Sequence, residues 1–280
     1  MLNFNAAESL LERVMKNLVS PEPGITLPWW PRLTQTLGGL RMREMTLLCA
    51  PTGSGKTQLL ANISAQLLLT KVPHFCAPVE TGDTDFVTRI LSVLDRRNYN
   101  TNEKFSIEEA QALFHRHAGT IRNGTLNIAT YENYVDVEEM ANLIRFQNQE
   151  YGCKVALLDN LNFFMKVTRA ADQLIEMDSA VREFVMLCKE IPVHVILIVH
   201  PKKTDGVRVE SEFDIKGSST AVQECANVLL WNRPKPDEVK QQLRLRTDRE
   251  AVFHKIRKRG EGVGLPIWFA FNNGRFEEFV

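Results

Sequence analysis

The sequence lacks an excess of charge of either sign, because 34 Lys and Arg residues are balanced by 34 Asp and Glu residues. A basic footprint over the whole chain is therefore absent, and any binding of nucleic acid has to use local patches. The sequence also lacks an apolar run near the roughly 18 residues that a membrane-spanning helix needs, and it shows no signal peptide. We therefore expect neither membrane insertion nor secretion.

Cysteine is scarce, and its five occurrences have no spacing typical of a metal site. Most of them lie in apolar segments, so we expect buried free thiols in a reducing compartment. They are Cys49, Cys76, Cys153, Cys188 and Cys225. The sequence also lacks internal repeats and low-complexity tracts. Its 280 residues, 44% of them apolar, suffice for one large α/β domain or two small ones.

The most informative segment runs from Ala50 to Thr57, Ala-Pro-Thr-Gly-Ser-Gly-Lys-Thr, and has the pattern of a phosphate-binding loop. Ala50 stands where the pattern usually has its first glycine, at a turn position that alanine can often occupy. The apolar run 45–49 predicts a buried strand before the loop. Helical spacing of apolar residues over 58–69 predicts a helix whose N-terminus faces the phosphates. An ordinary glycine-rich turn is the alternative.

The loop pattern implies a nucleotide and Mg²⁺. Backbone N–H groups would cradle the phosphates, Lys56 would reach the β- and γ-phosphates, and the hydroxyl of Thr57 would hold Mg²⁺. The predicted nucleotide-binding residues here are Pro51, Thr52, Gly53, Ser54, Gly55, Lys56, Thr57 and Gln58.

The rest of the chain alternates predicted strands and helices, which indicates an α/β fold with a mostly parallel sheet and helices on both faces. The predicted strands are 45–50, 73–78, 126–129, 154–159, 193–199 and 227–231. The predicted helices are 57–70, 83–97, 106–117, 136–150 and 173–190. After residue 240 the pattern changes to antiparallel hairpins. Their predicted strands are 242–246, 251–257, 266–271 and 275–279, with turns at 260–262 and 272–274.

An amphipathic helix is predicted over 4–18, with Asn5 as its cap and Glu8 completing a capping-box-like pair. The proline- and glycine-containing segment 20–24 cannot continue a helix and predicts a linker. We therefore divide the chain into a linker helix and linker, 1–24, and a main domain, 25–280. The helix packs either on its own core or on a neighbouring subunit.

Acidic residues end two of the predicted strands. Asp159 follows a buried apolar run, where ligands sit in nucleotide-binding α/β folds, and is placed to hold the water shell of Mg²⁺. Glu80 ends the second strand and is our candidate for the carboxylate that polarises the attacking water. Asp83 and Asp85 compete for this role, but both look like acids at a helix N-terminus.

His200 ends another apolar run, where it would contact the γ-phosphate and report its loss, or would simply face solvent. His194 lies within the same strand, and we interpret it as structural. The polar stretch that follows, 201–214, has no periodicity and predicts a mobile loop. Its cations Lys202, Lys203 and Arg208 either meet nucleic-acid phosphates or are solvated.

Lys255 and Arg257 alternate along one predicted strand and therefore point to the same face. Two cations on one face make an anion clamp. The neighbouring Lys258 and Arg259 keep a merely solvated strand face open as the alternative.

Together these segments resemble the RecA-like motor domain of the hexameric replicative DNA helicases, the DnaB superfamily, over roughly residues 5–280. The resemblance is closest to the branch of the mitochondrial helicase Twinkle and its phage relatives. The residues that carry it are Leu37-Gly38-Gly39-Leu40, the loop 50–57, Glu80, Asp159, His200-Pro201-Lys202-Lys203, the segment Lys216 to Glu224, and Lys255-x-Arg257-x-x-Gly260.

The resemblance implies further roles. His200 would sense the γ-phosphate, Gln223 would couple the nucleotide state to the DNA loops, and Arg233 would pack on the nucleotide base. Lys255 and Arg257 would act as fingers that reach the nucleotide of the adjacent subunit. The loop 201–215 would hold single-stranded DNA in a central channel, and the helix over 5–18 would dock on a neighbour.

The function implied is an ATP- or dTTP-hydrolysing, Mg²⁺-dependent helicase or translocase that forms a ring, expected to be hexameric, on single-stranded DNA. Primase and polymerase are the expected partners, in the cytoplasm or nucleoid in preference to the mitochondrial matrix. The alternatives are a RecA-fold DNA-dependent ATPase without unwinding activity, acting as a recombination mediator, loader or regulator, and a small-molecule kinase. Family members usually carry another domain before the linker, so this chain is either an excised motor domain or a single-domain member.

Overall fold

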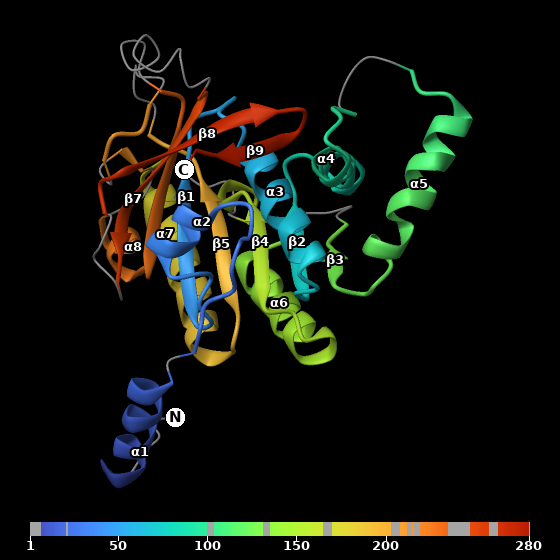
Figure 1. Cartoon of the computed structure of the whole chain (residues 1–280). Coiled ribbons are helices and arrows are strands. Elements are labelled where there is room, and N and C mark those ends of the chain that lie inside the picture. Colours follow the sequence, from blue (N-terminus) through green and yellow to red (C-terminus); the bar gives the residue numbers. More distant parts are fainter. Residues whose placement is uncertain are drawn as a thin grey trace.

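A computed structural model describes residues 7–20, 22–99, 104–130, 135–164, 170–202, 208–211, 214–215, 219–234, 247–257 and 263–279. Within this part of the chain one sheet holds nine strands in the order β3-β2-β4-β5-β1-β6-β7-β8-β9 (Figure 1). The parallel strands are β1 (Glu44–Cys49), β2 (His74–Pro78), β3 (Leu126–Ile128), β4 (Val155–Asp159), β5 (His194–Val199) and β6 (Asn227–Asn232). The antiparallel strands are β7 (Arg249–Ile256), β8 (Pro266–Asn272) and β9 (Arg275–Glu278).

Helices cover both faces of the sheet (Figure 1). The helical elements are α1 (Ala7–Val19), α2 (Pro31–Leu37), α3 (Lys56–Leu69), α4 (Asp83–Asp95), α5 (Ile107–Ile121), α6 (Val137–Tyr151), the 3₁₀ turn η1 (Leu161–Phe164), α7 (Ala170–Glu190) and α8 (Ser219–Glu224). None of the helices in the described ranges is long and apolar enough to cross a membrane.

The central strands are continuous apolar runs because each of them buries both faces. In β5, Val195 and Leu197 pack into the core under α6 and α7, whereas Ile196 and Ile198 pack into the core under α2, α3 and α4. This alternation places successive side chains on opposite sides of the sheet. The predicted α/β class, with helices on both faces and antiparallel strands at the C-terminus, is therefore confirmed.

Most predicted helix and strand boundaries lie within two residues of the observed ones in the described part of the chain, and two helix ends differ by more. Helix α5 continues to Ile121, beyond the predicted end at 117. Helix α7 begins at Ala170, earlier than the predicted 173. Two short helices, α2 and α8, were not predicted. The cap at Asn5, the run 242–246 and the turn 260–262 lie outside the described residues.

The C-terminal hairpin of β8 and β9 packs against the segment that precedes β1. The indole Nε1 of Trp30 donates to the Phe276 carbonyl at 2.8 Å, and the Glu278 carboxylate accepts the backbone N–H groups of Arg32 and Leu33. The predicted turn between β8 and β9 is present, with positive φ at Asn273 and Gly274. All five cysteines are buried and free, as the sequence predicts.

Candidate nucleotide site

The predicted phosphate-binding loop connects β1 to α3, and Gly55 caps the helix. Gly55 has φ 90°, a left-handed conformation that favours glycine, and a side chain there would meet the ring of Phe276 at 3.3 Å. Lys56 and Thr57 are the first two residues of α3, so the helix N-terminus faces the loop. Ala50 is fully buried at the end of β1.

Donors from β6 and β7, and from the residue after β6, hold the carbonyl groups of the loop. Trp231 Nε1 and Arg249 Nε both donate to the Ser54 carbonyl, at 3.0 and 2.6 Å, and Arg233 Nη2 donates to the Gly53 carbonyl at 2.9 Å. The C=O of Ser54 and the N–H of Gly55 belong to one planar trans peptide and point in opposite directions. Anchoring the carbonyl therefore turns the Gly55 N–H away from β6 and β7, toward the side on which a phosphate would lie.

The side chains that hold the loop carbonyls include a residue that the sequence pattern did not indicate. Arg249 was not predicted as a site residue, because its role depends on a contact with Ser54, which lies 195 residues earlier in the chain. Arg233 lies beside the loop, as a residue that packs on the base would, and that role stays a prediction. Gln58 was predicted to bind nucleotide, but its side-chain amide contacts the Gly274 carbonyl and Arg89 inside the subunit.

The two residues predicted to hold Mg²⁺ lie together beside the loop. Thr57 Oγ1 donates to Asp159 Oδ2 at 2.6 Å, and the second carboxylate oxygen of Asp159, Oδ1, is buried without a hydrogen-bond partner. Burial raises the pKa of Asp159 to about 6, and the hydrogen bond from Thr57 opposes that shift. A buried acceptor oxygen without a partner fits Mg²⁺ or one of its water ligands. Among the described residues, no three His, Cys, Asp or Glu side chains form a protein-only metal cage.

Glu80 and His200 lie together at the carboxyl ends of β2 and β5, as their positions in the sequence predict. Glu80 Oε2 and His200 Nε2 are 3.9 Å apart. Asn160, which sequence analysis did not single out, lies between them and contacts both through Nδ2. Asp83 and Asp85 lie in the first turn of α4, as expected for acids at a helix N-terminus.

The two predicted fingers contact the end of α8 in their own subunit. Lys255 Nζ donates to the carbonyls of Val222 and Gln223, at 3.0 and 2.6 Å. Arg257 Nη2 donates to the carbonyls of Gln223 and Glu224, at 3.1 and 2.8 Å. The predicted coupling residue Gln223 is therefore joined to both fingers through its backbone.

The structure does not bring these fingers to the phosphate-binding loop of the same subunit. Arg249, at the start of β7, contacts the loop, and Lys255 lies six residues further along the strand. At the rise of an extended strand this separation is roughly 20 Å, beyond the reach of a lysine side chain. Arg257 lies further away still.

The predicted DNA-binding segment is described only in part. Pro201 and Ile215 form an antiparallel bridge, and the Lys202 N–H donates to the Asp214 carbonyl, so the two ends of the segment are paired. The side chain of Lys202 is exposed, and Lys203 lies outside the described residues. Arg208 forms an ion pair with the buried Glu250 and donates to a backbone carbonyl, so its guanidinium has a structural role that the sequence did not indicate.

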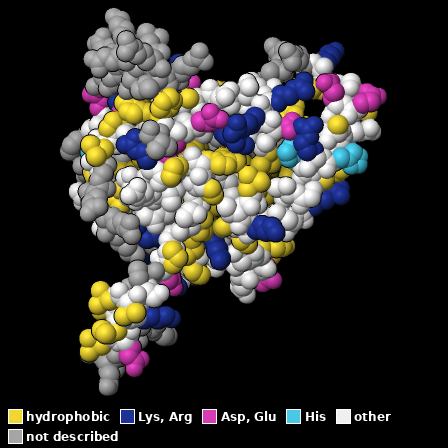
Figure 2. Space-filling view, viewed as in Figure 1, with side chains coloured by type: hydrophobic (Ala, Val, Ile, Leu, Met, Phe, Trp, Pro, Cys, Tyr) yellow, Lys and Arg dark blue, Asp and Glu magenta, His cyan; other side chains and the backbone are white. Residues whose placement is uncertain are grey.

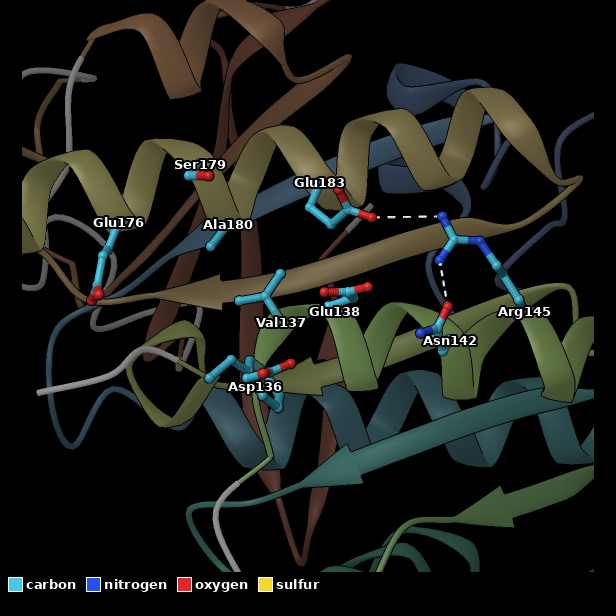
Figure 3. Close-up of a pocket in the computed structure, with 10 residues that line it drawn as sticks. Asp136, Val137, Glu138, Asn142, Arg145, Glu176, Ser179, Ala180 and Glu183 are labelled. Carbon is cyan, nitrogen blue, oxygen red and sulfur yellow. Dashed lines mark hydrogen bonds and ion pairs between the residues drawn. The ribbon is translucent and has the colours of Figure 1, made fainter. Parts of the chain in front are cut away.

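A separate hollow of about 450 Å³ lies between α6 and α7 (Figure 3). Four carboxylates line it, and their charge disfavours a triphosphate. They belong to Asp136, Glu138, Glu176 and Glu183. Arg145 lies among them and pairs with Glu183 at 3.5 Å. This hollow is therefore not the nucleotide site.

The fold and the loop together define a RecA-like P-loop NTPase. The family model of the DnaB-like helicase C-terminal domain matches residues 29–278, and the chain belongs to this family. It is therefore an NTP-hydrolysing domain of the replicative helicase type. The closer similarity to the Twinkle and phage branch stays a prediction.

Two solved structures support the fold. One is a separately solved ATPase domain with a TM-score of 0.78 at 16% identity, and the match covers 99% of this chain and 100% of that one. The other is a DnaB-like replicative helicase determined together with its interactions with primase. Its TM-score is 0.76 at 16% identity, and the match covers 100% of this chain and 68% of that one.

Proposed function

We propose that this chain is the motor of a ring that hydrolyses ATP or dTTP with Mg²⁺, moves along single-stranded DNA and unwinds duplex DNA. The observation that carries the proposal is the Thr57–Asp159 pair, whose remaining carboxylate oxygen has no partner, beside a phosphate-binding loop. Lys56 would bind the β- and γ-phosphates, and Thr57 and Asp159 would hold Mg²⁺, which supplies charge neutralisation at the phosphates.

The chemistry is an in-line attack of water on the γ-phosphorus. The water oxygen forms a bond to phosphorus, the bond to the oxygen that bridges the β-phosphate breaks, and ADP leaves with that oxygen. Glu80 orients the water and accepts its proton, which then passes to the phosphate product. His200, whose Nε2 lies 3.9 Å from Glu80 Oε2, would contact the γ-phosphate.

Lys255 and Arg257 complete the site of a neighbouring subunit in this proposal. Two observations support it: the distance of both residues from their own loop, and the two-cation face that they form. Such fingers neutralise charge that develops in the transition state, and their loss in related chemistry costs orders of magnitude in rate. Because both cations contact α8 carbonyls, engaging a neighbour's nucleotide would pull on the helix that carries Gln223.

Helix α1 would hold the neighbouring copy. It stands apart from the body of the molecule, and its apolar side chains are exposed (Figures 1 and 2). These are Leu10, Leu11, Val14, Met15, Leu18 and Val19. A largely apolar hollow of about 270 Å³ between α4 and α5 is the surface that we expect to receive it in the next subunit.

DNA would run through the ring along the segment 201–215, with Lys202 and Lys203 on its phosphates. Hexameric assembly, primase and polymerase as partners, and a place in the cytoplasm or nucleoid belong to the same proposal. The primase partner is supported by the DnaB-like helicase whose interactions with primase have been determined.

The test is Mg²⁺-dependent ATP hydrolysis with and without long single-stranded DNA, using Lys56→Ala as the inactive control. We expect strong stimulation by DNA. Hydrolysis that ignores DNA would contradict a translocating ring. Strand displacement on a forked duplex then separates a helicase from the alternative, a DNA-dependent ATPase that loads or regulates other proteins without unwinding.

A further inference from the structure

A single buried amide joins the two residues that the proposed function places at the γ-phosphate. Asn160 is 1% exposed and directly follows Asp159 at the end of β4. Its Nδ2 donates to Glu80 Oε2 and lies 3.0 Å from His200 Nε2. Its Oδ1 accepts the backbone N–H of Asn162 at 3.0 Å.

These contacts fix which end of the amide faces the site. A carboxylate accepts hydrogen bonds and a backbone N–H donates them, so the NH₂ group must face Glu80 and the carbonyl must face Asn162. The second N–H of the same NH₂ group is then directed at His200 Nε2. That ring nitrogen must act as an acceptor, which requires a neutral imidazole whose hydrogen is on Nδ1.

We propose that Asn160 is a positioning residue that orients the Glu80 carboxylate and sets the tautomer of His200 at the same time. A phosphate oxygen only accepts hydrogen bonds, so His200 can contact it only through an N–H. While Asn160 donates to Nε2, the hydrogen of the neutral ring is on Nδ1. One amide therefore decides both where the Glu80 carboxylate points and which nitrogen of the His200 imidazole carries the hydrogen.

This inference rests on the proposed roles of Glu80 and His200, but its first test needs no nucleotide. Long-range ¹H–¹⁵N correlation spectra of the nucleotide-free protein report the tautomer of each imidazole, and His200→Gln identifies the signal among the six histidines. We expect the Nδ1–H tautomer at His200. Asn160→Asp replaces the donor with an acceptor of the same shape, so we expect the ring hydrogen to move to Nε2. An Nε2–H tautomer in the unmodified protein would overturn the inference.

The second test separates positioning from binding. We expect Asn160→Asp and Asn160→Leu to lower kcat by roughly 10- to 100-fold while KM for ATP changes by less than about threefold, because a misplaced catalytic group costs rate more than affinity. The matched control is Asn148→Asp, which removes an amide donor to the Cys153 carbonyl at the other end of the sheet and should leave kcat and the tautomer unchanged.

The outcomes distinguish the two proposals. If Glu80→Gln retains full activity, the proposed function of this site fails, and the tautomer still decides whether Asn160 sets the state of His200. If Glu80→Gln is inactive but both Asn160 variants keep the kcat of the unmodified protein, the positioning role is wrong and the site assignment stands.

Discussion

At the scale of single residues, two buried histidines in the sheet are held in one protonation state by their partners. His74 Nδ1 lies 2.9 Å from the Val72 carbonyl, and His194 Nδ1 lies 2.7 Å from the Arg41 carbonyl. Because a carbonyl oxygen only accepts hydrogen bonds, each Nδ1 must carry a hydrogen. Their Nε2 atoms contact the hydroxyls of Ser64 and Thr46. Burial lowers the pKa of both histidines to about 4, so both are neutral in the folded protein near pH 7.

These histidines predict a loss of stability in acid. The unfolded chain protonates each of them below about pH 6.5, whereas the folded protein resists protonation down to about pH 4. Between these values the unfolded state binds more protons, so the free energy of unfolding falls as pH decreases, by about 2 kcal/mol per histidine at pH 5. Asp159, whose pKa is raised to about 6, acts in the opposite direction over the same range.

Urea denaturation at pH 7 and pH 5 measures this effect when the unmodified protein is compared with His74→Asn, which retains a donor toward the Val72 carbonyl. We expect the variant to be less stable at pH 7 but to lose about 2 kcal/mol less between the two pH values. An identical pH dependence in both proteins would show that His74 is not kept neutral by the fold.

The site was predictable where chemistry follows from position in a motif. Lys56, Thr57, Glu80, Asp159 and His200 could be named as candidates because each lies in the loop pattern or at the end of an apolar run. Residues that act only by contacting these candidates or the loop backbone could not be found in this way. Asn160 and Arg249 act through contacts with residues 80 and 195 positions away in the chain, and no local spacing encodes such contacts.

At the scale of elements, apolar runs and long amphipathic helices were predictable because their periodicity repeats over several turns. Helices α2 and α8, with seven and six residues, are too short to show a period. Helix α2 does carry local signals, with proline in its first turn and Gly38 in a left-handed cap at its end. The hairpin turn before Arg275 was predictable because its Asn-Asn-Gly sequence favours positive φ.

Helix α1 gives the prediction at this scale. Leu11→Asp with Leu18→Asp should abolish ring assembly without unfolding the domain, because both side chains are largely exposed in the single subunit. Burying two leucines in an interface contributes roughly 3–6 kcal/mol. Light scattering after gel filtration, with nucleotide and Mg²⁺ present, measures the assembly.

The matched control for that experiment is Lys16→Asp, which places the same charge elsewhere on α1 and should leave assembly intact. Rings of unchanged size in the double variant, with unchanged circular dichroism in all three proteins, would show that α1 does not hold the neighbouring subunit.

At the scale of the whole molecule, the sheet separates the two parts of the site that we propose neighbouring subunits share. The phosphate-binding loop lies at the carboxyl end of β1, where Arg249 contacts it. Lys255, roughly 20 Å further along β7, and Arg257, directly after β7, instead lie against α8. In our account, a single subunit binds nucleotide but cannot bring its own Lys255 and Arg257 to it. Ring assembly therefore completes catalysis in our account, and the isolated subunit should hydrolyse ATP poorly.

The measurement that tests this claim most directly is complementation between two inactive variants. Lys56→Ala loses the phosphate-binding lysine, and Arg257→Ala loses the finger but should still bind nucleotide; each should lower ATP hydrolysis by at least about 10³-fold alone. Mixed before assembly, they form rings in which a Lys56→Ala subunit supplies its intact finger to the intact loop of an Arg257→Ala neighbour. We predict that the mixture recovers a substantial share of the activity of the unmodified protein. A mixture as inactive as its two components, although mixed rings form, would contradict sites completed by the neighbouring subunit.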